Sequence, residues 1–232
     1  MDITFTPSID IPEDLYPQPA SKNLPDWYKK TDSYWTKEKK PTDQNDFPET
    51  IKKCLPIFDA ITSGYIIKTV TDIFITKRPD ETFYSWPGPF ENNQNPLEFH
   101  RLEQAELHPL SNGENYPKWN NPWSIKTPPG YSCLFITPLH RDLPFTLMPG
   151  IVDTDKFIHN VNFPFVMTDK DFEGLIPIGT PMVQVIPFKR DSWQMKIGND
   201  KDKRERERYF NFMFRKMYDR YKTMGWTKKE FK

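Results

Sequence analysis

The chain has little of what marks a membrane-bound, secreted or disulfide-stabilised protein. Its two cysteines, Cys54 and Cys133, lie far apart in apolar segments, so we expect reduced thiols and no disulfide framework. No apolar run reaches the roughly 18–20 residues that a membrane-spanning helix needs. The first residues lack the basic and apolar regions of a signal peptide. These absences predict a cytoplasmic protein without a membrane partner.

An excess of positive charge is also lacking. The 232 residues include 32 lysines and arginines and 32 aspartates and glutamates, so the formal net charge is zero. General binding to nucleic acids requires a basic surface, and this composition does not indicate one. Phosphate-binding loops, dinucleotide fingerprints and Ser-His-Asp elbows are missing from the sequence as well. We therefore expect no cofactor.

Aromatic residues and prolines are abundant, whereas glycine is scarce. Phe, Trp and Tyr make up 15% of the chain, and there are 24 prolines but nine glycines. Large rings bury much apolar area each, which offsets a hydrophobic content of 36%. Prolines interrupt helices and central strands. The composition thus favours a folded chain with many fixed loops over a helical bundle.

The segment 128–190 has the densest strand pattern. GYSCLFITP, FVM and MVQVIPF are short, β-branched or aromatic, and bounded by Pro, Gly or Asp. We expect a mainly β fold, α+β by count, with a β-clip-like or small antiparallel barrel core. The composition and the residue pattern change along the chain and predict three regions. These are an extended Pro-rich arm at 1–50, a β-rich core domain at 51–198 and a C-terminal helix at 199–232.

Both ends of the chain carry candidate contact surfaces. In the N-terminal region, Trp27 and Trp35 could either attach the arm to its own core or clasp a neighbouring subunit. Residues 199–224 have helical periodicity, with Asn199 or Asp200 as the cap and Gly225 as the stop. Apolar residues at spacings of three and four form an amphipathic stripe that could pack on the sheet or face another subunit, and its contact candidates are Phe210, Phe214, Met217 and Tyr221.

Two weaker patterns concern metal ligands. His140 and Asp142, together with His159, resemble the ligands of a two-histidine, one-carboxylate iron site, which would make an Fe(II)-dependent oxygenase a minor alternative. The close spacing of the third ligand argues against this site, so we predict no metal. Asp72 interrupts an apolar run and is either a turn position or a buried carboxylate with a role.

The core segment resembles the trimeric dUTPase and dCTP deaminase family, whose fold is the β-clip. Three pieces carry the resemblance in order: a strand with its lead-in at 129–138, the GIVDTD sequence at 150–155 and the GTPMVQV sequence at 179–185. The resemblance implies a nucleotide-binding or nucleotide-hydrolysing enzyme. In that alternative Asp153 orients water, and Mg²⁺ would assist.

Further residues follow from the same resemblance. Asp155 would be a second catalytic candidate, Lys156 and Phe157 stand where the family has its base-stacking tyrosine, and Gln184 matches the strand glutamine. In the nucleotide alternative Asp72, which lies outside the resembling pieces, would be a ligand-binding residue that could hold the metal. The family's Arg-Ser pair and glycine-rich tail are absent, and a carboxylate alone cannot neutralise a triphosphate. We favour the simpler explanation of the GIVDTD sequence, a tight turn that the aspartate side chains stabilise.

The whole chain, especially PQPASKNLPDWYKK and IKKCLPIFDAITSGY, also resembles uncharacterised proteins of marine T4-like phages and some bacteria. This resemblance implies a phage-encoded protein in the host cytoplasm or the virion. We therefore predict a non-enzymatic assembly or binding protein that self-associates or binds another phage or host protein. Rigid proline-rich segments suit such a role, because they lose little entropy when they dock.

Overall fold

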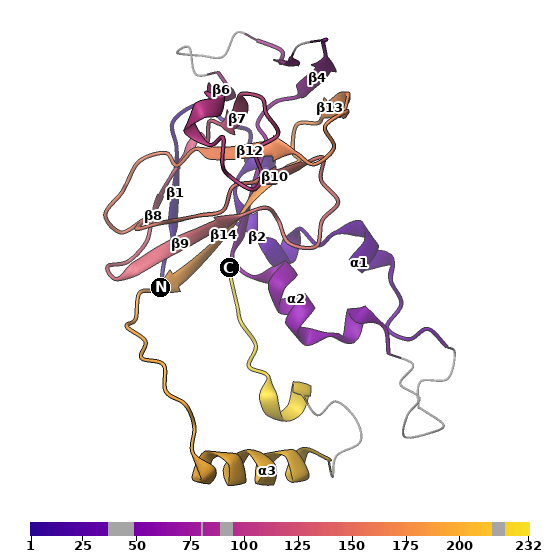
Figure 1. Ribbon diagram of the computed structural model, residues 1–232, viewed down its shortest axis with the longest axis vertical. Coiled ribbons are helices and arrows are strands. Elements are labelled where there is room, and N and C mark those ends of the chain that lie inside the picture. Colours follow the sequence, from indigo (N-terminus) through magenta and orange to yellow (C-terminus); the bar gives the residue numbers. More distant parts are fainter. Residues whose placement is uncertain (37–48, 80, 89–94, 215–220) are drawn as a thin grey trace. The chain divides into compact units, whose positions relative to one another are not determined.

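The computed structural model describes residues 1–36, 49–79, 81–88, 95–214 and 221–232 (Figure 1). Within these ranges, fourteen strands form four antiparallel sheets. The prediction of a mainly β fold is confirmed. Each sheet is open, so none of those that the structure describes closes on itself, and the small-barrel alternative is wrong.

The largest sheet holds the segment that the sequence marked as the core. Its strand order is β11-β9-β14-β3-β2, and Figure 1 shows β9 and β14 running side by side. The strand β14 lies at its centre because Val183 and Val185 are fully buried and β-branched, which suits a strand with two neighbours. The bounds are β11 Gly150–Val152, β9 Tyr131–Ile136, β14 Pro181–Lys189, β3 Tyr65–Lys68 and β2 Gln18–Pro19.

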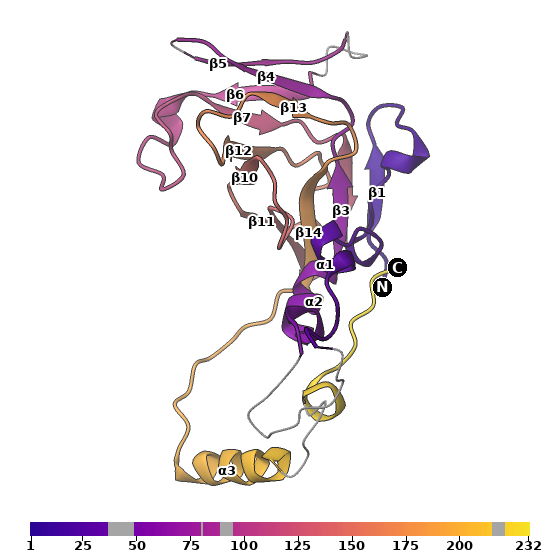
Figure 2. The ribbon, with the colours of Figure 1, turned by 90° about the vertical axis from the view of Figure 1, so that its right-hand side faces the viewer.

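Three smaller sheets complete the β structure. The first has the order β10-β12-β7-β6, the second β13-β4-β5, and the third pairs β1 with β8. Figure 2 shows β4, β5 and β13 beside β6 and β7, where the rings of Tyr84 and Phe99 meet. The bounds are β10 Phe145–Leu147, β12 Phe163–Met167, β7 Tyr116–Trp119, β6 Leu97–His100, β13 Gly174–Ile176, β4 Ile73–Lys77, β5 Thr82–Ser85, β1 Thr4–Pro7 and β8 Trp123–Lys126.

Aromatic side chains fill the centre of the β structure. Trp119 stacks on Phe165 with ring centres 4.6 Å apart, and Phe145 meets both rings edge-on. Trp123 is also buried, with 2% of its surface exposed. The large rings therefore do compensate for the modest hydrophobic content, from strands β7, β8, β10 and β12.

Helices form the smaller part of the described ranges, and α3, with 15 residues, is the longest of those described there. Among them, α1 directly follows Pro25, whose fixed φ suits the start of a helix. The α-helices are α1 Asp26–Lys30, α2 Leu55–Thr62 and α3 Asp200–Phe214. The 3₁₀ turns are η1 Glu13–Leu15, η2 Ala20–Lys22, η3 Ile51–Lys53 and η5 Leu102–Gln104, and η6 at Tyr221–Gly225 is a π-helical turn.

The chain divides into two compact units. The first comprises residues 1–26, 61–190 and 231–232, and it contains all fourteen strands. The second comprises residues 27–60 and 191–230. This grouping cuts across the three predicted regions, because the start of the Pro-rich arm contributes β1 to the β unit while its later part belongs to the second unit.

The predicted C-terminal helix begins where the sequence indicated. Asn199 caps α3, since its side-chain oxygen accepts a hydrogen bond from the backbone N–H of Lys201 at 2.9 Å. The Asp202 carboxylate in turn accepts from the N–H of Asn199 at 2.7 Å. The α-helix runs to Phe214, residues 215–220 lie outside the described ranges, and the chain resumes in the π-helical turn η6.

Candidate functional site

The two aspartates of the GIVDTD sequence lie in a turn that follows β11. The backbone N–H groups of Lys156 and Phe157 both donate to the carbonyl of Asp153, at 2.9 and 2.8 Å. The Asp153 carboxylate accepts from the Ser132 hydroxyl at 2.7 Å, and Asp155 accepts from the N–H of Gly130 at 2.8 Å. Both carboxylates therefore hold the turn against the start of β9.

Arg190, directly after β14, joins the two carboxylates. Its guanidinium donates to both oxygens of Asp155, with one contact at 2.8 Å, and it lies 3.2 Å from Asp153. It also donates to the carbonyl of Tyr131 and the hydroxyl of Ser132, at 2.9 and 3.0 Å. A planar guanidinium suits such bidentate pairing with a carboxylate. We call this group, Asp153, Asp155 and Arg190, the carboxylate turn.

Arg190 stabilises the ionised form of Asp155. The hydrogen bonds from Arg190 lower the pKa of Asp155 well below its ordinary range, against the opposing effect of burial, and the N–H of Gly130 adds to the lowering. The same contact raises the pKa of Arg190. Asp155 has 7% of its side chain exposed, whereas Asp153 has 49% exposed. Asp155 is thus a structural anchor that is ionised at neutral pH, and Asp153 is the member that solvent reaches.

The lowered pKa of Asp155 predicts an acid-dependent loss of stability. A depressed folded pKa stabilises the protein fully above the ordinary value of about 3.8, and this contribution is lost as the pH falls further toward the folded pKa. We expect Asp155→Asn to lower the free energy of unfolding at neutral pH. The difference in this free energy between the variant and the natural protein should become smaller as the pH falls below about 3.8. Urea unfolding across the acid range measures this difference.

Asp153→Asn is the matched control for that experiment, because it removes a neighbouring carboxylate that is half exposed and has one contact with Arg190 at 3.2 Å. It should cost less stability than Asp155→Asn at neutral pH. If the difference in the free energy of unfolding between Asp155→Asn and the natural protein were the same at every pH, the ionised form of Asp155 would not stabilise the fold.

Gln184 lies in the interior of the β unit. Only 1% of its surface is exposed, its carbonyl oxygen accepts from the N–H of Leu139 at 2.9 Å, and its amide donates to the carbonyl of Ser63 at 2.7 Å. Buried polar side chains are normally satisfied in this way. These contacts give Gln184 a structural role, which ties two loops to β14.

Asp72 and the carboxylate turn use different partners. The Asp72 carboxylate accepts from the N–H of Ile178 at 2.7 Å and so fixes the loop between β13 and β14. Among the described contacts, no hydrogen bond or ion pair links Asp72 with Asp153 or Asp155. The structure therefore brings Asp153 and Asp155 together but does not join Asp72 to them.

The residues after the carboxylate turn are on the surface. Lys156 is exposed, and Phe157 is 50% exposed with its ring 6.0 Å from that of His159. His140 lies in another turn, with a left-handed φ of 56°. In the part of the chain that is described, His140, Asp142 and His159 do not meet as a metal-binding group, and no other group of three such residues does.

The two cysteines are free thiols, as expected. Burial raises the pKa of Cys133 to about 11, while a hydrogen bond from Thr154 acts in the opposite direction. The Cys133 thiol is therefore protonated at neutral pH, and a protonated thiol is a poor nucleophile.

The predicted contact residues differ in how far they are exposed. Trp27 is half-buried and meets Tyr28 edge-on, whereas Trp35 is 64% exposed. On α3, Phe210 is 58% exposed, and its neighbours Tyr209 and Phe212 are 50% and 54% exposed. Tyr221 is 46% exposed, the side chain of Phe214 lies outside the description, and Met217 belongs to the residues that are not described.

A further apolar segment precedes α3 and was missed by the analysis of the sequence. Residues 192–197 belong to no helix or strand, and none of the described strands pairs with them. Trp193, Met195 and Ile197 are 91%, 85% and 90% exposed, and they alternate with Ser192, Gln194 and Lys196. Apolar residues at every second position are typical of a strand with one buried face, so the period of two was the available signal. We call residues 192–197 the alternating segment.

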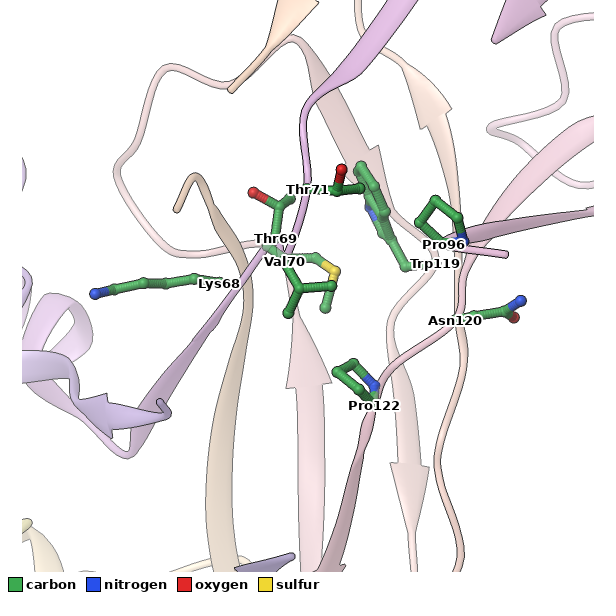
Figure 3. Close-up of a pocket in the computed structure, with 9 residues that line it drawn as sticks. Lys68, Thr69, Val70, Thr71, Pro96, Trp119, Asn120 and Pro122 are labelled. Atoms are coloured by element: carbon green, nitrogen blue, oxygen red, sulfur yellow. The ribbon is translucent and has the colours of Figure 1, made fainter. Parts of the chain in front are cut away.

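One hollow lies in the β unit, away from the predicted site residues. Its empty space of about 240 Å³ includes open solvent, and the enclosed part has room for about one water molecule. Figure 3 shows the side chains that line it. The indole N–H of Trp119 is buried and has no hydrogen-bond partner among the described residues. Leaving such a donor unpaired costs about 1–3 kcal/mol. No motif in the sequence predicts the hollow or the unpaired indole N–H beside it.

Comparison of the chain with protein-family models and with curated proteins gives no match in either case. The resemblances to the dUTPase family and to phage proteins therefore stay predictions. In the described ranges, no helix has both the length and the apolar character to span a bilayer.

Proposed function

We propose that this chain is a non-enzymatic assembly protein that associates with a second copy of itself through the alternating segment. The observation that carries the proposal is the nearly complete exposure of Trp193, Met195 and Ile197 on a segment that pairs with none of the described strands. The alternation of apolar and polar residues suits a strand with one covered face, and a strand with unpaired backbone groups readily pairs with another strand. Two copies of this segment, side by side, would pair their backbones and cover their apolar faces.

The exposed area is of the right size for such a contact. Trp193 and the three aromatic residues of α3, Tyr209, Phe210 and Phe212, are 50–91% exposed. At about 150–250 Å² for each ring, they offer roughly 400–600 Å². Met195 and Ile197 add to this area, and a stable interface buries about 800 Å² on each partner. The second unit thus has enough apolar surface for a self-complementary contact.

The charge balance favours a second copy as the partner. The formal net charge is zero, so two copies do not repel one another at long range. The first turns of α3 alternate acidic and basic residues, from Asp200 to Arg208. A surface of mixed sign is compatible with itself in a two-fold contact, whereas a partner of strong charge would gain little from it.

The carboxylate turn supports this proposal over a nucleotide-hydrolysing enzyme. A water-orienting aspartate needs nearby cationic groups that are free to neutralise phosphate charge. The cation beside Asp153 is Arg190, and its strongest contacts go to Asp155. Binding a triphosphate there would have to break the ion pair that fixes the turn.

The test is the mass of the protein in solution, measured by light scattering over a range of concentrations. We expect the natural protein to reach the mass of a dimer, and the triple variant Trp193→Ser, Met195→Ser, Ile197→Ser to stay monomeric. The matched control, Ser192→Ala, Gln194→Ala, Lys196→Ala, changes the other face of the same segment and should still associate.

Two results would count against the proposal. A natural protein that is monomeric at every concentration would remove the second copy as the partner. Association that survives the triple variant would place the contact elsewhere on the chain. Circular dichroism of each variant shows whether the fold is intact, and the β unit should be unaffected because the substituted side chains are at least 85% exposed.

A further inference from the structure

The formal net charge of zero is the sum of opposite charges on the two units. The second unit, residues 27–60 and 191–230, contains 19 lysines and arginines and 13 aspartates and glutamates. The β unit has the reverse balance, with 13 basic and 19 acidic residues, so the formal charges are +6 and −6. The second unit alone therefore has the excess of positive charge that a polyanionic partner requires.

One side of α3 carries three of these cations. Lys201, Arg204 and Arg208 are exposed and follow one another at spacings of three and four, which places them in a row along the helix. Phe212, four residues after Arg208, continues the row and is 54% exposed. Glu205 stands beside the row, but its side chain is shorter than those of the three cations, which reach farther from the helix axis. We call Lys201, Arg204, Arg208 and Phe212 the basic row.

The mixed charges of α3 belong to its other sides. Asp202 and Arg206 are four residues apart and opposite in sign, and so are Lys203 and Glu207. Asp200 pairs with Lys203 at 3.3 Å. Among the contacts of the described residues, the three cations of the basic row take part in no ion pair. Their charges are thus available to a partner.

We propose that the basic row binds single-stranded nucleic acid. Lysine and arginine side chains neutralise phosphates, and an exposed ring can stack on an unpaired base. The three cations span about 10 Å of the helix axis, which matches roughly three stacked nucleotides at about 3.4 Å each. Tyr209 and Phe210 do not belong to the row, and neither does the alternating segment, so the site does not require the association of two copies.

An anionic membrane is a less suitable partner. A helix that lies in a membrane surface needs an apolar face along its length. Residues 200–208, nine of the 15 residues of α3, include no apolar side chain. Duplex DNA is less suitable as well, because its bases are already paired and stacked and would offer Phe212 nothing to stack on.

The test is the fluorescence anisotropy of labelled oligodeoxythymidine and oligouridine of about 20 nucleotides, longer than the roughly 4–16 nucleotides that single-strand sites cover. We expect saturable binding of at least one of them by the natural protein. Between about 50 and 200 mM salt, the affinity should fall at least about tenfold, because bound phosphates release their counterions.

The variant Lys201→Gln, Arg204→Gln, Arg208→Gln removes the charges of the basic row and keeps residues that favour a helix. Its affinity should be at least about tenfold lower at about 50 mM salt. The slope of log affinity against log salt should decrease in magnitude by about 2, since each phosphate contact with a single strand contributes about 0.7. Circular dichroism shows whether the helix is intact.

Three further variants separate the contributions to binding. The matched control Lys22→Gln, Lys126→Gln, Lys170→Gln removes three exposed cations from the β unit and should bind like the natural protein. Phe212→Ala should lower the affinity about tenfold without changing the salt slope, because it removes a ring and no charge. The serine variant of the alternating segment should still bind, so that a failure of self-association would leave this result unchanged.

Three results would overturn the proposal. The first is no binding of either oligonucleotide at about 50 mM salt. The second is an equal loss in the glutamine variants of the basic row and of the β unit, which would indicate a general effect of charge. The third is binding to vesicles that contain phosphatidylserine but to neither oligonucleotide, which would indicate a membrane surface as the partner.

Discussion

Gly64→Ala is expected to destabilise the protein by at least about 3 kcal/mol. Gly64 follows α2 and precedes β3, with a φ of +71°, a conformation that favours glycine. A Cβ atom built there would lie 1.9 Å from the carbonyl oxygen of Val185 and 2.9 Å from its carbonyl carbon. Because the obstacle is the backbone of the central strand β14, a side-chain rotation cannot relieve it. The measurement is urea-induced unfolding.

Gly130→Ala is the control that separates two contributions to this loss of stability, the steric contact with β14 and the cost of a left-handed φ. Gly130 has a similar φ of +84°, but nothing lies within 4 Å of the position of its Cβ. Its replacement should therefore cost only the left-handed conformation, about 1–2 kcal/mol. Equal losses for the two variants would show that β14 moves away from residue 64 without cost, and the contact would then not fix the packing.

The strands that the sequence located best are those with strong local signals. The segment GYSCLFITP became β9 and MVQVIPF lies within β14, since both combine β-branched or aromatic residues with turn residues at their ends. The helix α3 was located for a similar reason, because Asn199 caps it and its charges alternate from the first turn. Local chemistry determined these elements, and so a sequence analysis could find them.

The strand pairings were beyond such an analysis. The strand β1 at the start of the chain pairs with β8, with Thr4 opposite Lys126, and β3 pairs with β14, with Tyr65 opposite Val185. Pairing over such separations depends on which apolar faces fit together in three dimensions, and this cannot be determined from a single sequence. The first residues were therefore predicted as an arm, although the structure places β1 in the β unit.

The candidate site likewise contains residues that the sequence indicated and residues that only the structure revealed. The sequence indicated Asp153 and Asp155 because they stand in a recognisable turn, but it gave no sign of Arg190, which is 35 residues from Asp155. The ion pair decides which carboxylate is an anchor and which is open to solvent. The alternating segment was detectable by its period of two, yet its significance lies in its exposure, which only the structure reports.

The second large effect is expected for Phe165→Ala, which should lower the stability by about 3–5 kcal/mol. Phe165 is fully buried on β12, stacks on Trp119 at 4.6 Å and meets Phe145 at 5.5 Å, so its removal leaves a cavity among rings that cannot collapse easily. Urea unfolding measures the loss. Phe74→Ala is the control, because Phe74 is 44% exposed on β4 and should cost less than about 1 kcal/mol.

The same substitution tests how the β unit positions its orphan donor. Without the ring of Phe165, the indole of Trp119 loses the surface that fixes its plane, although its own N–H is untouched. In proton–nitrogen NMR spectra, we expect the indole resonance of Trp119 to broaden in the Phe165→Ala variant while that of Trp123 stays sharp. If Phe165→Ala cost no more than Phe74→Ala, the aromatic stack would not be a rigid core.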